Sequence, residues 1–124
     1  MSYTGIVLVS HSSKVAEGIK EIIREVTKEV PVVAAGGTEE NEIGTSVEKI
    51  EQAIHQADGG NGVLVFYDIG SAKMNVEMLL ETVEDVDARL LEAPILEGSY
   101  VAAVEASMEK SVDDISQAIK KSFG

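Results

Sequence analysis

The chain has 124 residues and no cysteine, and its 22 acidic and 10 basic side chains give a formal net charge of -12. This length predicts one domain, residues 1–124, and the missing cysteines exclude disulfide frameworks, thiol catalysis and thiolate metal sites. The acidic balance argues against nucleic acid and anionic membranes as partners, since binding to phosphate backbones requires clustered Lys and Arg. No apolar run approaches about 20 residues and no signal peptide is visible, so we expect a cytoplasmic protein.

The first predicted strand is the apolar run of residues 5–9, which ends abruptly in Ser-His-Ser-Ser at positions 10–13. A Val/Ile/Leu run without polar alternation is typical of a strand buried on both faces of a parallel sheet. An amphipathic helix follows, and Ser12 or Ser13 can cap its start. Its spacing predicts a single buried stripe formed by Val15, Ile19, Ile22, Ile23 and Val26.

Residues 30–35 form the second predicted strand, and Pro31 places it at a sheet edge because proline cannot donate to a ladder. A polar loop over residues 36–43 carries three glutamates. Thr45, with Glu48 three residues later, then predicts a capping box at the start of the second helix. The apolar face of this helix consists of Val47, Ile50, Ala53 and Ile54.

The third predicted strand, residues 63–67, is again continuously apolar and ends in a polar turn at residues 68–71. The third helix is indicated by Val76, Leu79, Leu80 and Val83. A short fourth strand is predicted at residues 87–91. Two further helical patterns follow at about residues 100–108 and 111–122, the second starting with a capping box of Ser111 and Asp114.

The order of these elements predicts an α/β fold, a single doubly wound open sheet, mainly parallel, with helices on both faces. With the second strand at the edge, the simplest strand order is 2-1-3-4. That order places the carboxyl ends of the first and third strands side by side. His11 and Asp68, which follow these two strands, are therefore expected to be neighbours.

Ligands of such sheets bind beyond the carboxyl ends of the strands, and the helix after His11 directs free N–H groups to that position. These donors favour an anion, most naturally a phosphate. A carboxylate at Asp68 can accept the Nδ1–H of His11 and leave Nε2 free as a nucleophile. We therefore predict that His11 accepts and donates a phosphoryl group on Nε2, and that Asp68 orients its ring.

Hydroxyls and glycine N–H groups along the same rim are candidates for stabilising the phosphate, and we select Ser12, Ser13, Thr38, Gly70 and Ser71. No metal site is predicted. Simpler interpretations exist: a histidine after a strand can be an ordinary rim residue, and Asp68 and Thr45 can be helix caps. Lys14, Lys73 and His55 are interpreted as surface residues.

Met74 and Met78 lie one turn apart, off the core stripe of the third helix. They form either a contact patch for a partner or peripheral packing, and the sequence does not separate the two.

The motifs resemble the IIA domains of the mannose-type phosphotransferase system (the EIIA-Man fold). Within that family they are most similar to the phosphoryl-donor subunits of phosphotransferase-dependent dihydroxyacetone kinases. The similar segments span nearly the whole chain and are residues 5–12, 35–38, 43–46, 67–72, 74–75 and 97–98. The sugar-transport members are expected to carry a Phe-Gly-Gly-Ser-Pro-like turn after the acid, where this chain has Ile-Gly-Ser-Ala.

The resemblance implies that the small carrier protein HPr phosphorylates His11. The group would then pass to ADP held on the nucleotide-binding subunit of the kinase, while another subunit holds dihydroxyacetone. No cofactor is expected on this chain, because ADP, ATP and Mg²⁺ belong to the partner. The resemblance also implies a homodimer. Some members carry fused HPr-like and enzyme I-like domains, and because this chain stops at Gly124 we expect HPr to act in trans.

Two alternatives stay open: a sugar-transport IIA domain that passes phosphate to a IIB domain, and a regulatory module controlled by phosphorylation. A receiver domain is rejected, because Ser10 and His11 stand where an acidic pair would bind magnesium. A histidine phosphatase is rejected, because the only arginines, Arg24 and Arg89, are far from the predicted rim.

Overall fold

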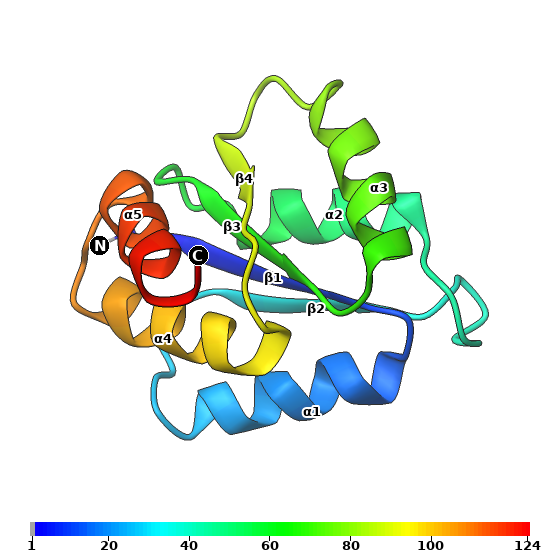
Figure 1. Cartoon of the computed structure of the whole chain (residues 1–124), viewed down its shortest axis with the longest axis horizontal. Helices are drawn as coiled ribbons and strands as arrows, with labels where there is room; N and C mark the ends of the chain where they lie inside the picture. The colour runs from blue at the N-terminus through cyan, green and yellow to red at the C-terminus, as the bar shows by residue number, and fades with distance from the viewer. Residues whose placement is uncertain (1) are drawn as a thin grey trace.

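The computed structural model, which describes residues 2–124, contains a four-stranded parallel sheet in the order β2-β1-β3-β4 (Figure 1). The strands are β1 (Gly5–Ser10), β2 (Val32–Gly36), β3 (Val63–Tyr67) and β4 (Ala88–Leu90). The helices are α1 (Ser13–Arg24), α2 (Val47–Ala57), α3 (Gly70–Leu80), α4 (Ile95–Ser107) and α5 (Val112–Phe123). The predicted fold class and strand order are therefore confirmed. No helix within residues 2–124 is long and apolar enough to cross a membrane.

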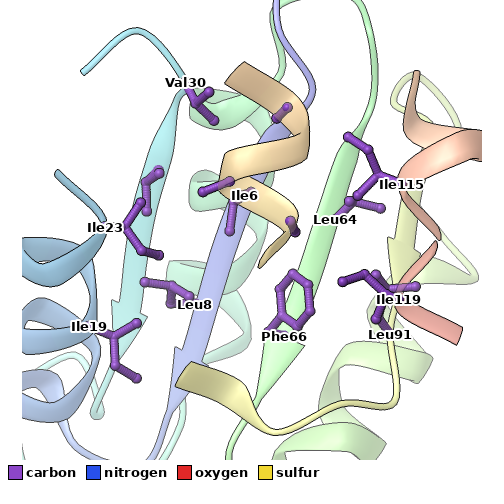
Figure 2. Packing of buried hydrophobic residues seen from close by; sticks show 14 of the residues in the cluster. Ile6, Leu8, Ile19, Ile23, Val30, Leu64, Phe66, Leu91, Ile115 and Ile119 are labelled. Atoms are coloured by element: carbon purple, nitrogen blue, oxygen red, sulfur yellow. The ribbon is translucent and has the colours of Figure 1, made fainter. Parts of the chain in front are cut away.

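The two inner strands are buried on both faces, as their continuous apolar runs predict. Side chains alternate between the faces, so Ile6, Leu8 and Phe66 pack with α1, α4 and α5 (Figure 2). Their neighbours Val7 and Val65 belong to a second apolar cluster under α2 and α3. Two helical layers thus enclose the sheet, with α1, α4 and α5 on one face and α2 and α3 on the other (Figure 1).

The buried stripe expected on α1 is narrower in the structure. Ile19 and Ile23 are buried, but Val15, Ile22 and Val26 remain between 45% and 47% exposed. The small side chain of Ala16 takes the third buried position on α1. The prediction that all five aliphatic residues face the core was therefore wrong, because helical spacing alone does not define the width of the face that the sheet covers.

Several boundaries also differ from the sequence prediction. Strand β2 begins at Val32 instead of residue 30, so Pro31 precedes the strand. Helix α4 begins at Ile95 instead of near residue 100, and it includes Gly98. A Cβ on Gly98 would lie 2.7 Å from the Cβ of Ala93 and 3.1 Å from the Phe66 ring. This glycine therefore permits close packing of α4 on β3 and does not break the helix. Strand β4 is shortened to three residues, all of them only partly buried at the edge of the sheet.

Helix α2 is capped by Ser46, not by Thr45. The hydroxyl of Ser46 accepts the Lys49 N–H at 3.2 Å, which is the geometry of an N-cap. Thr45 instead accepts a hydrogen bond from the side-chain amide of Asn75 on α3 at 2.6 Å. The predicted capping box was wrong by one residue, and the displaced threonine joins the loop before α2 to α3.

We expect Phe66→Ala to lower the free energy of unfolding by about 3–5 kcal/mol, because the buried ring fills the space between β3 and Gly98. Urea unfolding followed by circular dichroism measures this change. Met78→Ala is the control: its side chain is 66% exposed, so its loss should alter the unfolding free energy by less than about 0.5 kcal/mol. Equal effects of the two substitutions would contradict the packing described.

Candidate functional site

His11 lies between the end of β1 and the start of α1, at the carboxyl edge of the sheet. Val9 pairs with Tyr67, so the residues that follow β1 lie level with those that follow β3. Asp68 accordingly reaches His11 at two points: one carboxylate oxygen accepts the His11 backbone N–H at 2.9 Å, and the other lies 3.1 Å from Nδ1. The predicted strand order thus brings the predicted pair together.

The Asp68 carboxylate is the centre of a hydrogen-bond network that links the two strand ends. Besides the two His11 contacts, it accepts the Ser10 hydroxyl at 2.9 Å and the Ile69 backbone N–H at 2.8 Å. Ser10, which is fully buried, accepts in turn the Ser12 N–H at 3.0 Å. Each carboxylate oxygen therefore has two donors, and the orientation of the group is fixed.

These donors also explain the acidity of Asp68. Partial burial by itself would raise the pKa of this carboxyl, since it disfavours the charged form. Hydrogen bonds from the His11 backbone, the His11 ring and Ser10 outweigh that effect and lower its pKa below the ordinary value. An ionised Asp68 accepts a hydrogen bond from Nδ1–H, and in this tautomer the lone pair of the His11 ring is on Nε2.

The other ring nitrogen of His11 points to the start of α3. Its Nε2 lies 2.7 Å from the Ser71 hydroxyl, which donates to the lone pair in this tautomer. The His11 side chain is 20% exposed. The ring is therefore held rigidly at Nδ1, whereas Nε2 meets a single hydroxyl on an exposed helix turn.

The first turn of α3 supplies donors on the Nε2 side. Its N-cap residue, Ile69, makes no side-chain capping hydrogen bond. The N–H groups of Gly70 and Ser71, which have no intrahelical partner at this position, are available to an anion. The helix dipole adds to this preference. Gly70 and Ser71 lie on this turn, and the Ser71 hydroxyl contacts Nε2; their role in stabilising a phosphate stays a prediction.

The other predicted phosphate ligands have different positions. Ser12 caps α1 and accepts the Val15 N–H at 3.3 Å. Ser13 begins α1 and lines a cavity with Glu17 and Lys49 beside the β2 edge. Thr38 closes its own loop, where its hydroxyl accepts the Glu42 N–H at 3.1 Å. Among the described hydrogen bonds, none joins Ser13 or Thr38 to His11, and their phosphate contacts remain predictions.

Sequence reasoning missed two backbone segments, at Gly44 and Gly36, that contact His11 and the start of α1. Gly44, in the left-handed region with φ at 140°, donates its N–H to the His11 carbonyl at 2.8 Å. Gly36 at the end of β2 approaches the start of α1 so closely that a Cβ would lie 2.5 Å from the Ser12 carbonyl oxygen. Glycines at the ends of predicted strands and loops were the available signal for both contacts.

Two lysines near the rim, Lys73 and Lys49, are paired with other protein groups, whereas Lys14 on the first turn of α1 is exposed. Lys73 on α3 pairs with Glu92, which raises the pKa of the lysine and lowers that of the glutamate. Glu92 also accepts the Tyr67 hydroxyl at 2.6 Å, and this hydrogen bond raises the pKa of Tyr67. Lys49 donates to the Asn41 side chain and to the Gly36 carbonyl. Lys73 and Lys49 are thus held by protein oxygens.

His55, the other histidine, belongs to a separate surface contact on α2. Its ring lies 3.0 Å from the Glu51 carbonyl oxygen and 3.2 Å from the Asp85 carboxylate, and its side chain is 43% exposed. These two contacts raise the pKa of His55. Within residues 2–124, no three His, Asp or Glu side chains are grouped so that they could hold a metal ion.

Comparison with known proteins identifies relatives over nearly the whole chain. The sequence model of the EIIA-man family, described as the PTS system fructose IIA component, matches residues 5–116. The phosphoryl donor subunit DhaM of the PEP-dependent dihydroxyacetone kinase 1 from Listeria innocua is 40% identical over 116 residues, covering 94% of this chain and 92% of that protein.

Two further proteins are similar to this chain over nearly its whole length. The phosphotransferase subunit DhaM of the PTS-dependent dihydroxyacetone kinase from Lactococcus lactis is 38% identical over 121 residues, covering 98% of this chain and 96% of that protein. The crystal structure of EF1359, a protein of unknown function, superposes with a TM-score of 0.82 at 31% sequence identity. It covers 93% of this chain and 91% of that one.

We expect the stabilisation due to Asp68 to disappear in acid. Its folded-state pKa lies below the ordinary 3.8. The ionised carboxylate therefore contributes fully above that pH and loses its contribution as the pH falls through the lower, folded-state value. Urea unfolding of wild type and Asp68→Asn across a pH series should show a difference that is largest near neutrality and shrinks below about pH 4.

The control for this series is Glu17→Gln, which removes an exposed carboxylate from α1. It should leave the unfolding free energy within about 0.5 kcal/mol of wild type at every pH. A difference between wild type and Asp68→Asn that stays constant from pH 7 to pH 2 would contradict the stabilising role of the ionised carboxylate.

Proposed function

The chain belongs to the EIIA-man family, and from this premise we propose that it is the phosphoryl donor subunit of a phosphoenolpyruvate-dependent dihydroxyacetone kinase. The observation that carries the proposal is the asymmetry of the His11 ring. Nδ1 is fixed by Asp68 at 3.1 Å, and within residues 2–124 Nε2 meets only the Ser71 hydroxyl, at 2.7 Å. This geometry suits a histidine that accepts and donates a phosphoryl group on Nε2.

In the accepting step, Nε2 attacks the phosphorus atom held by a phosphohistidine of the carrier HPr. The P–N bond of the donor breaks as the Nε2–P bond forms, while the Nδ1 proton stays in its hydrogen bond to Asp68. The imidazole ring gains positive charge, which the ionised carboxylate of Asp68 stabilises. Ser71 first releases the Nε2 lone pair by rotation of its hydroxyl, and the same hydroxyl can then donate to a phosphoryl oxygen.

The transferred phosphoryl group carries its charge on three oxygens, and catalysis of the transfer depends on positioning and on donors for these oxygens. The N–H groups of Gly70 and Ser71 provide such donors on the α3 side. The hydroxyls of Ser12 and Ser13 lie at the start of α1 and are candidates for the opposite side. Backbone N–H groups hold an anion without adding a fixed positive charge.

In the donating step, the group passes from His11 to ADP held on the nucleotide-binding subunit of the kinase, which forms ATP there. A further subunit binds dihydroxyacetone, which receives the phosphate. Two anionic groups must approach each other in this step, and the rim of this chain offers few free cations, since Lys73 and Lys49 are paired. The acceptor therefore brings Mg²⁺ and basic side chains to offset the repulsion.

We expect incubation with enzyme I, HPr and phosphoenolpyruvate to add one phosphate per chain, detected by intact mass. The phosphate should be acid-labile, because phosphoramidates hydrolyse in acid, and it should be absent from His11→Ala. His55→Ala is the matched control, since it removes the second histidine at a surface position away from Asp68. A normally labelled His11→Ala, or a label lost only from His55→Ala, would overturn the assignment of His11.

The identity of the acceptor separates this function from a sugar-transport IIA domain. We expect phosphorylated protein, mixed with the nucleotide-binding subunit in its ADP form and the dihydroxyacetone-binding subunit, to yield dihydroxyacetone phosphate. The initial rate at low protein concentration should fall as ionic strength rises, because a chain of net charge -12 is steered to a basic face.

The comparison for this assay is a sugar-specific IIB domain offered in place of the kinase subunits. Efficient transfer to the IIB domain with none to ADP would place the chain in the sugar-transport branch of the family. A phosphorylated protein that transfers to neither acceptor would favour the regulatory module.

A further inference from the structure

Five large apolar side chains are exposed around the His11 site: Ile43, Val47, Ile69, Met74 and Met78. We call this set the methionine face. Ile43 is 77% exposed, and the two methionines are 64% and 66% exposed. Because most of the Met74 and Met78 side chains is exposed, they contribute little to the stability of the fold. Exposed apolar side chains grouped near a functional site are typical of an interaction surface.

The methionine face is continuous with the reactive nitrogen. Ser71, Met74 and Met78 are spaced i, i+3 and i+7 and therefore share one side of α3. Ser71 at the head of this stripe lies 2.7 Å from Nε2. At its other end, Met78 and Val47 line one cavity of about 210 Å³ between α2 and α3. The stripe thus runs from His11 along α3 to the start of α2.

The loop that carries Ile43 is fixed to the same site. Thr45 accepts the Asn75 side-chain amide at 2.6 Å, which ties the loop to α3. Gly44, the neighbour of Ile43, donates its N–H to the His11 carbonyl. Ile43 and Ile69 therefore occupy the two segments, residues 43–46 and 68–71, that hold the His11 backbone and ring. Both apolar side chains therefore lie on segments that adjoin the His11 site.

The charges around the methionine face are mainly acidic. Glu77 and Glu81 lie on or just after α3 and are exposed. The loop before α2 and its first turn add Glu39, Glu40, Glu42 and Glu48, all exposed. The nearby ammonium group of Lys73 is paired with Glu92. A protein that fits this surface presents apolar side chains surrounded by lysine and arginine.

We propose that the methionine face is the docking surface for the nucleotide-binding subunit of the kinase. That subunit would place apolar side chains, surrounded by basic ones, against α3. The inference rests on the proposed function. Transfer requires the acceptor phosphate to come within about 3–3.5 Å of the phosphoryl group on Nε2. The subunit that delivers it must therefore cover Ser71, and the next turn of α3 presents Met74.

A second copy of this chain is a poor occupant of the same face. It would bury Nε2 and prevent transfer, and its own acidic rim would repel this one, since each chain carries a net charge of -12. Methionine suits a partner that must dock and leave in every turnover. Its unbranched, polarizable side chain adapts to the opposing surface without demanding a single tight fit.

The experiment loads His11 without any protein donor. Phosphoramidate transfers its phosphoryl group to Nε2 and releases ammonia, so loading reports the chemistry of His11 alone. Wild type, Met74→Ala/Met78→Ala and Met108→Ala are loaded in this way. Each is then titrated into the ADP-bound nucleotide-binding subunit, with Mg²⁺, the dihydroxyacetone-binding subunit and dihydroxyacetone. The rate of dihydroxyacetone phosphate formation gives kcat and KM for the phosphorylated chain.

Met108 provides a matched control because it is also a methionine and is 54% exposed. It lies just after α4, at the opposite edge of the sheet, where the neighbouring Lys110 carbonyl accepts the hydroxyl of Thr4 ahead of β1. We expect all three proteins to load equally. The double variant should raise KM by about tenfold with kcat within about twofold, and Met108→Ala should match wild type.

Several outcomes would contradict the proposed docking surface. In the kinase assay, these are an unchanged KM in the double variant or an equal rise of KM in Met108→Ala. The proposal would also fail if the double variant were phosphorylated more slowly by HPr but transferred normally to the kinase, or if its mass in solution showed the loss of a dimer. Failure of the proposed function looks different, because wild type would then load with phosphoramidate but yield no dihydroxyacetone phosphate, or would not load at all.

Discussion

The Asp68 carboxylate is the interaction on which the site depends. It receives four donors from two strand ends: the backbone and ring of His11, the hydroxyl of Ser10 and the N–H of Ile69. One charged group thus fixes the backbone after β1, the tautomer of the ring and the turn that leads into α3. Because all four bonds converge on two oxygens, the position of Nε2 is determined by the sheet and not by a flexible loop.

The contact with Asp68 gives the two nitrogens of the His11 ring different roles. Nδ1 is used for orientation, so the ring cannot turn and present the wrong nitrogen. Nε2 is left to a hydroxyl on the first turn of α3, which rotates without breaking any backbone hydrogen bond. The proposed carrier function needs this division, since a rigid nucleophile whose reactive face is only lightly covered can be reached by one partner after another.

The sequence predicted the parts that depend on strong and local patterns. The apolar runs of β1 and β3, with Pro31 in the predicted second strand, were enough to give the strand order and hence the contact of His11 with Asp68. The width of the buried face of α1 and the start of α4 were predicted wrongly, because both depend on what packs against these helices. Gly98 resembles a helix breaker in sequence, yet the Phe66 ring makes it a packing position.

The choice between Thr45 and Ser46 as the helix cap shows the same limit at the site itself. Each has a hydroxyl at a suitable spacing, and only the proximity of Asn75 on α3 assigns Thr45 to a tertiary contact. Ser10 is a similar case, since its role requires knowing that the last residue of β1 turns its hydroxyl toward Asp68. Local spacing identifies candidate groups, whereas the packing of distant elements decides which partner each one takes.

The positions of the two arginines suit the release of a phosphoryl group that the proposed function requires. Arg24 donates to the Val30 carbonyl at 2.6 Å, and Arg89 binds Asp87 and Asp113, so both guanidinium groups are engaged in holding the fold. A guanidinium at His11 would bind the phosphoryl group in the resting state as well as in transfer, and that uniform binding would not lower the barrier to transfer. In the proposed transfer, the neutral N–H donors of α3 would hold the group more weakly than a guanidinium. The cations that stabilise the transition state would then arrive with the acceptor, so that transfer would be fast only in the complex.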